Sequence, residues 1–142
     1  MEARSRWTMH WDEVSVLDGN AVSLGVEEID LMRAAGESLA EAASAMSNGR
    51  VLFLCGPGNN GGDGFVAACS ESLSGRSAVL ASRPSSNTDA SSQARSIAEE
   101  SPGVHVWPSR PDGDWDLVVD CLLGAGGGGP GSSLRAPISE MA

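Results

Sequence analysis

The seven residues Gly58-Asn59-Asn60-Gly61-Gly62-Asp63-Gly64 decide the fold of this chain. The apolar run 51–55 precedes them directly, and a stretch of apolar and small residues, 65–69, follows them. That order predicts a β-strand, a glycine-rich loop and an α-helix. Such a loop gathers backbone N–H groups at the start of the helix, where an anionic ligand can bind. Because glycine has no Cβ, the backbone here can adopt positive φ and approach a ligand closely.

Part of this segment matches a dinucleotide-binding pattern. Residues 56–61 fit G-x-G-x-x-G, although in a chain with 18 Gly the match alone is weak. The pattern expects an acidic residue after the second strand, whereas the predicted strand 77–81 is followed by Ser82 and Arg83. An arginine at that place accommodates a 2′-phosphate and favours NADP over NAD. The alternative for the segment is a tight turn whose Asp caps the helix.

The rest of the chain alternates between strand and helix patterns. Alternation of this kind predicts a parallel sheet with helices on both faces. The fold class is therefore α/β, a Rossmann-like three-layer α/β/α arrangement with a mainly parallel sheet, and 142 residues suffice for one domain, 1–142. We expect strands at 51–55, 77–81, 103–107 and 117–121, and helices ending at Gly25, at 30–46, from the glycine loop to about Leu73, at 89–100 and at 134–141.

A second site element lies near the end of the chain. Asp120 ends the apolar strand 117–121, and a carboxylate there belongs at the carboxyl edge of the sheet, where ligands bind in α/β folds. If this strand lies beside 51–55, Asp120 and the glycine-rich stretch 124–129 come next to Asn59, Asn60 and Asp63. The alternative is an aspartate that only caps the following loop.

Charge and composition exclude several classes of protein. The formal net charge is −10, and all nine basic residues are Arg, so no basic surface for nucleic acid or an anionic membrane is expected. No apolar run is long enough to span a bilayer, and no signal-peptide pattern opens the chain. Three cysteines without C-x-x-C spacing suit buried thiols in a reducing compartment, so we expect a cytoplasmic location.

The sequence resembles a known family along most of its length. Residues 55–64 resemble the signature of the YjeF N-terminal domain family, the NAD(P)H-hydrate epimerases. Residues 17–36 are similar to the family's N-terminal helices, 116–126 to its later strand and second glycine loop, and 135–137 to its Arg-x-Pro. The family continues to a further Asp-x-Pro-Ser-Gly segment, so we expect the C-terminal part of the domain to be missing here.

The resemblance implies an isomerase of nicotinamide nucleotide repair. The family interconverts the R and S forms of NAD(P)H hydrate so that a partner dehydratase can restore the cofactor. It further implies a potassium ion bound by Asn60 and Asp120, and it is compatible with a homodimer through the N-terminal helices. The implied substrate contacts are Asn59, Asn60, Gly61, Gly62, Asp63, Gly124, Ala125, Gly126, Gly127, Gly128 and Gly129.

Two matters stay open from the sequence. The catalytic base is not assigned, because Asp63 and Asp120 are both candidates and Asp120 is better assigned to the ion. The alternative functions are a non-catalytic nucleotide-binding or scaffold domain of the same fold, and a fragment of a bifunctional epimerase/dehydratase.

Overall fold

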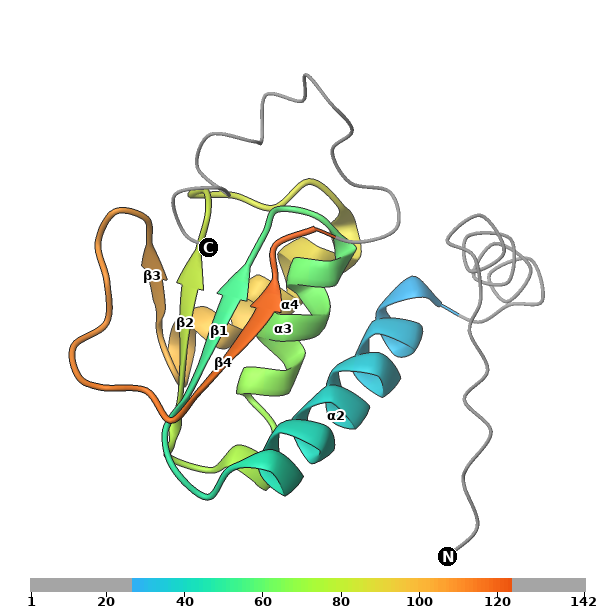
Figure 1. Cartoon of the computed structure of the whole chain (residues 1–142). Coiled ribbons are helices and arrows are strands. Elements are labelled where there is room, and N and C mark those ends of the chain that lie inside the picture. The colour runs from blue at the N-terminus through green and yellow to red at the C-terminus, as the bar shows by residue number, and fades with distance from the viewer. Residues whose placement is uncertain (1–26, 124–142) are drawn as a thin grey trace, which may run out of the picture.

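The computed structural model describes residues 27–123 of the chain (Figure 1). The segments expected to form a helix ending at Gly25, a glycine loop at 124–129 and a helix at 134–141 lie outside the described residues. In chain order, the described elements are α2 (Glu28–Met46), β1 (Val51–Cys55), α3 (Asn59–Ala68), the short 3₁₀ helix η1 (Glu71–Leu73), β2 (Ser77–Ala81), α4 (Asp89–Glu100), β3 (Val104–Val106) and β4 (Leu117–Cys121).

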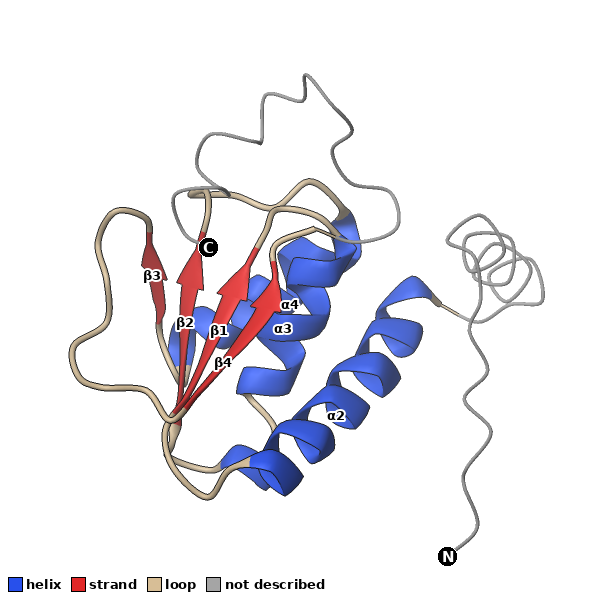
Figure 2. Ribbon diagram, viewed as in Figure 1, coloured by secondary structure: helices blue, strands red, loops and turns tan. Residues whose placement is uncertain are grey.

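The four strands form one parallel sheet with the order β3-β2-β1-β4 (Figure 2). The α/β class, the parallel sheet and the positions of all four strands are confirmed. β4 pairs with β1, as expected, and the register places Asp120 beside Leu54 and Cys121 beside Cys55. All strands therefore end at the same edge of the sheet, which is where α3 begins (Figure 1).

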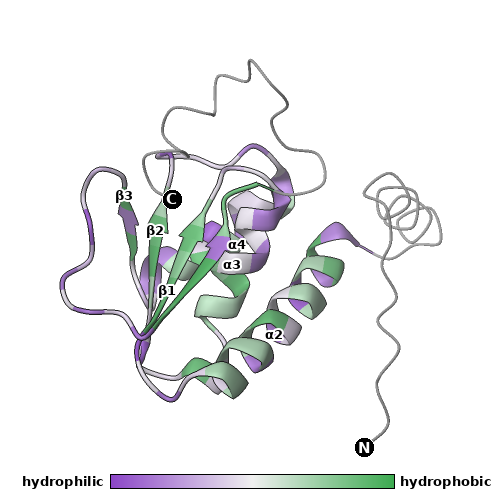
Figure 3. Cartoon of the chain, viewed as in Figure 1, coloured by the Kyte–Doolittle hydropathy of each residue, from purple (hydrophilic) through white to green (hydrophobic). Residues whose placement is uncertain are grey.

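The three α-helices cover one face of the sheet. Val51, Phe53 and Cys55 of β1 are fully buried in one cluster with apolar residues of α2, α3 and α4. The alternate side chains of β1, Leu52 and Leu54, belong to a second cluster, against which two tryptophans of the β3–β4 connection pack. Figure 3 shows hydrophobic residues concentrated along the strands, whose side chains contribute to both clusters. Within residues 27–123 the arrangement is thus one helical layer on a parallel sheet.

The end of one helix differs from the sequence prediction. α3 ends at Ala68 rather than near Leu73, because Ser70 starts a new turn. The Ser70 hydroxyl accepts a hydrogen bond from the N–H of Ser72 (3.2 Å) and donates one to Glu37 of α2 (2.8 Å). At the end of α2, Met46 is 74% exposed, so this apolar side chain does not reach the core in the last turn of the helix. Among the described helices, none is long and apolar enough to cross a membrane.

Candidate functional site

The signature segment is the start of a helix rather than a loop. α3 begins at Asn59, and Gly58 is its N-cap with a φ of −91°. Among the described residues the glycines with positive φ are Gly75, Gly103 and Gly113, none of which belongs to the signature. The signature glycines therefore do not use the positive φ that glycine permits.

The signature glycines serve close packing. A Cβ on Gly61 would collide with the backbone carbonyl oxygen of Gly56, and a Cβ on Gly62 would collide with the Met32 side chain. A Cβ on Gly64 would stand 2.7 Å from Cys55 Sγ, closer than real Cβ contacts come, and 3.1 Å from Cys121 Sγ, which is tighter than most of them. The absence of side chains thus lets the first turns of α3 lie directly against the sheet and α2.

The N-terminus of α3 is open to an anion. No side chain caps this helix, and its first turn contains no acidic residue. Within residues 27–123 the first N–H of the segment with a backbone acceptor is that of Gly62, which donates to Gly58 O (3.1 Å). The preceding N–H groups carry the positive end of the helix dipole at the carboxyl edge of the sheet, the kind of place where phosphate binds in α/β folds.

Asn59 and Asn60 connect the start of α3 to its two neighbouring segments. Asn59 Oδ1 accepts a hydrogen bond from Thr88 Oγ1 (2.6 Å), and Asn60 Nδ2 donates one to Leu123 O (2.7 Å). Thr88 is the N-cap of α4, and Leu123 lies two residues beyond β4. The paired asparagines therefore hold three segments of the site together. The sequence analysis missed Thr88 and Leu123, although the capping-box spacing from Thr88 to Ser91 was a usable signal.

Replacing Thr88 with alanine removes both the cap of α4 and the anchor of Asn59. We expect the free energy of unfolding to fall by about 1–2 kcal/mol, since a lost threonine cap costs this much. Urea denaturation followed by tryptophan fluorescence measures the change. Thr88→Ser keeps the hydroxyl and should restore most of the stability; an alanine variant as stable as the parent would contradict the role of Thr88.

The sequence left open whether Asp120 lies at the carboxyl edge of the sheet or only caps the following loop, and in the structure it does both. It lies at the carboxyl edge of β4 beside β1, as predicted, and it is exposed. Its Oδ1 also accepts a hydrogen bond from the N–H of Leu122 (3.0 Å), so it caps the following turn as well. The other expected contacts at this edge, Gly124, Ala125, Gly126, Gly127, Gly128 and Gly129, lie outside the described residues.

The two cysteines under this edge are held as neutral thiols. Burial raises the pKa of Cys121 from its usual value near 9 to about 12, with smaller contributions from the charges of Asp63 and Asp120. Burial also raises the pKa of Cys55 well above its usual value, and Arg95 opposes the shift in part. The charges of both carboxylates therefore reach Cys121.

These thiols predict a pH-dependent stability and a selective reactivity. Their folded-state pKa values are raised, so the folded state holds protons that the unfolded state loses; stability should be unaffected below about pH 9 and fall as the pH rises toward 12. At pH 8, iodoacetamide should label the exposed Cys69 in the folded protein and leave Cys55 and Cys121 intact. Mass spectrometry before and after urea denaturation checks this, and rapid native labelling of Cys121 would refute it.

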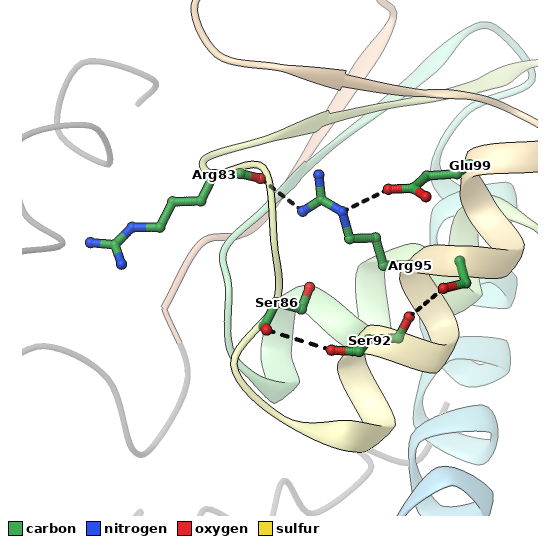
Figure 4. A network of polar contacts seen from close by, with 6 residues as sticks. Arg83, Ser86, Ser92, Arg95 and Glu99 are labelled. Carbon is green, nitrogen blue, oxygen red and sulfur yellow. Dashed lines mark hydrogen bonds and ion pairs between the residues drawn. The ribbon is translucent and has the colours of Figure 1, made fainter.

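A buried arginine supports the segment after β2. Arg95 of α4 is only 6% exposed. Its guanidinium donates to Arg83 O (2.8 Å) and to the Glu99 carboxylate (3.0 Å), as Figure 4 shows. In the same region the hydroxyl oxygens of Ser82 and Ser86 are buried, and among the described residues neither has a hydrogen-bond partner. A mid-helix arginine is normally expected at the surface, so the sequence carried no signal for Arg95.

Among residues 27–123 no three His, Cys, Asp or Glu side chains gather where they could hold a metal ion. A cation at this edge would depend on the oxygen atoms of amide, carbonyl and aspartate groups. Asn60 Oδ1 and Asp120 Oδ2 fit that requirement, because no donor among the described residues bonds to either of them. Hard oxygen ligands of this kind suit alkali and alkaline-earth cations rather than soft metals.

A family match and two relatives of known name resemble this chain. A family described as "YjeF-related protein N-terminus" matches residues 28–142. The chain is 37% identical to the bifunctional NAD(P)H-hydrate repair enzyme Nnr of Methanospirillum hungatei, over 89% of this chain and 28% of that protein. It is 39% identical to the NAD(P)H-hydrate epimerase of Rhodopirellula baltica, over 80% of this chain and 50% of that protein.

A solved structure shows the same fold. The crystal structure of the yeast protein YNL200c superposes with a TM-score of 0.78 at 22% identity, over 96% of this chain and 63% of that one. The chain spans half or less of the length of the two relatives above.

Proposed function

Because this chain belongs to the family of YjeF-related protein N-termini, we propose that it interconverts the R and S epimers of NAD(P)H hydrate. Relatives named NAD(P)H-hydrate epimerase support this reaction. The observation that carries the proposal is the uncapped start of α3 at the carboxyl edge of the sheet, joined to both neighbouring segments by Asn59 and Asn60. That arrangement offers N–H groups to a nucleotide phosphate and carboxylates to a proton transfer.

In this proposal the nucleotide lies along the carboxyl edge of the sheet. The N–H groups at the start of α3 bind a phosphate, which their geometry and the helix dipole favour. The substrate contacts proposed for the described part are Asn59, Asn60, Gly61, Gly62 and Asp63, and those proposed outside it are residues 124–129. The hydrogen bond from Thr88 already orients the Asn59 side chain. Substrate binding therefore costs less conformational entropy at this residue.

Potassium is proposed as the resident cation. Asn60 would hold it through Oδ1, while its Nδ2 keeps donating to Leu123 O. Asp120 would hold it through Oδ2, while its Oδ1 keeps accepting from the N–H of Leu122. When bound, the ion supplies positive charge that offsets Asp120 beside an anionic nucleotide. Asp63 is then the carboxylate of the described site that is not committed to the ion. It lies half-buried in α3, and no base is assigned.

The proposed product is used by a second enzyme. Relatives that carry the name of a bifunctional repair enzyme suggest partnership with an NAD(P)H-hydrate dehydratase, on the same or another polypeptide. We also propose a cytoplasmic location, which the three free cysteines suit, and a homodimer through the N-terminal helices. A nucleotide-binding domain without catalysis is the second candidate, because the uncapped start of α3 can bind a phosphate whether or not a base is present.

The decisive experiment is epimer interconversion. The purified chain is given NADPH hydrate as a single epimer with potassium chloride, and NMR follows the appearance of the other epimer. The proposal requires a rate above the spontaneous one. Nucleotide binding without acceleration would favour the non-catalytic domain, and neither binding nor acceleration would refute both.

A further inference from the structure

The segment between β2 and α4 is built into the proposed nucleotide site. Ser82 still pairs with β1 through its N–H, which donates to Cys55 O (2.9 Å). Farther along, Asn87 N donates to Pro57 O (2.7 Å), and Thr88 then bonds to Asn59. The segment 82–87 is therefore fixed against the turn that leads into α3. A nucleotide whose phosphates lie at the start of α3 passes beside it.

This segment carries positive charge without a compensating acid. Residues 82–88 contain Arg83 and no Asp or Glu. Arg83 is half-buried, and among the described residues no carboxylate forms an ion pair with its guanidinium. Figure 4 shows its side chain extending away from Arg95, with only its carbonyl oxygen held by that residue. The guanidinium is thus available to an anion from outside.

Beneath the segment lies a second positive charge. Arg95 is 6% exposed, while the side chain of its ion-pair partner Glu99 is 51% exposed. A half-exposed carboxylate is screened by water more than a buried guanidinium, so a positive potential remains under residues 82–87. Arg95 also fixes the backbone of Arg83 through its hydrogen bond, which positions that residue.

The same segment contains two buried hydroxyl groups, those of Ser82 and Ser86. Both oxygen atoms are buried, and neither has a hydrogen-bond partner within residues 27–123; Ser82 as a residue is 7% exposed. Buried hydroxyls almost always have a partner, so two orphans in one short segment indicate that an acceptor is supplied from elsewhere. An anionic oxygen is an acceptor that a hydroxyl and a guanidinium can share.

From this geometry we infer that segment 82–87 binds the phosphate on the 2′ position of an adenosine ribose, so that the chain prefers NADPH hydrate to NADH hydrate. The inference deepens the proposed function and rests on it for the nucleotide. In dinucleotide-binding sheets an acid after the second strand binds the free ribose hydroxyls, whereas an arginine accommodates the phosphate. Ser82 and Arg83 stand at that place, and the two orphaned hydroxyls are the independent observation.

The test compares two fragments of the nucleotide as probes. Isothermal titration calorimetry measures binding of 2′,5′-ADP and of 5′-AMP to the chain at low salt. We expect 2′,5′-ADP to bind at least about tenfold more tightly, since one charge-assisted contact is worth that much. Arg83→Gln should bring 2′,5′-ADP to the affinity of 5′-AMP and leave 5′-AMP unchanged. Arg33→Gln, an exposed charge on α2, is the matched control and should keep the preference.

A second variant separates binding from folding. Ser82→Ala removes an unpartnered hydroxyl, so it should be at least as stable as the parent and still lose several-fold in affinity for 2′,5′-ADP. Equal binding of both probes to the parent, or a preference that survives Arg83→Gln, would overturn the inference. Equal epimerisation of both hydrates would overturn it and leave the proposed reaction standing. Discrimination through Arg83 without any epimerisation would support the phosphate site and refute the proposed reaction.

Discussion

Replacing Gly61 with alanine should lower the free energy of unfolding by about 2–4 kcal/mol, a large effect for a one-methyl change. The added Cβ would collide with the carbonyl oxygen of Gly56. That atom belongs to the backbone, so no change of rotamer can relieve the collision. Alanine gains about 1 kcal/mol of helix propensity over glycine, which offsets only part of the cost. Urea denaturation monitored by circular dichroism gives the difference.

Gly58 is the matched control for this experiment. It lies three residues earlier in the same signature, and a Cβ there would meet no atom within 4 Å. Its φ of −91° is open to any residue, so Gly58→Ala should cost at most about 1 kcal/mol, through the weaker N-cap. If the two variants were equally stable, close packing would not explain the signature glycines, and a role in ligand approach would have to be reconsidered.

Replacing Asp120 with asparagine should abolish most of the effect of potassium on the activity. Asparagine keeps an oxygen that can accept the hydrogen bond from the N–H of Leu122, so the turn after β4 is preserved while the charge is lost. If Asp120 holds the ion, the potassium concentration for half-maximal epimerisation should rise by about 10–100-fold. The rate of epimer interconversion, measured across a potassium titration, provides the readout.

Asp116 gives a matched control at the opposite edge of the sheet. It directly precedes β4, and its Oδ2 accepts a hydrogen bond from Arg50 N (2.7 Å), a role like that of Asp120. Asp116→Asn removes the same charge and should leave the potassium titration unchanged. An Asp120 variant with the parental potassium dependence would remove Asp120 from the ion site and leave it only its capping role.

Much of the architecture followed from local patterns in the sequence. The runs at 51–55, 77–81 and 117–121 became strands with those bounds. In β1 and β2 consecutive apolar residues are buried, as in a parallel sheet, whereas β4 leaves Val118 and Asp120 exposed. Asp120 was placed at the carboxyl edge beside β1 because parallel strands end at a common edge. The helix at 89–100 was also predicted with its observed bounds.

The functions of individual site residues did not follow from local patterns. Asn59 contacts Thr88, and Asn60 contacts Leu123, 63 residues away in the chain. No periodicity within a segment encodes such a pairing. The burial of Arg95 likewise depends on how α4 packs against α3 and the segment after β2, which is a property of three elements together.

By itself, the sequence determined an α/β chain with a parallel sheet and a glycine-rich start to the helix after β1, because these depend on residue type and spacing along the chain. Only the tertiary structure decided what the glycines do. Gly61, Gly62 and Gly64 are needed where α3 meets the Gly56 backbone, Met32 and the cysteine pair, and not for an unusual backbone conformation. The reason is physical: a missing Cβ permits either positive φ or close packing, and the neighbours in space determine which one is used.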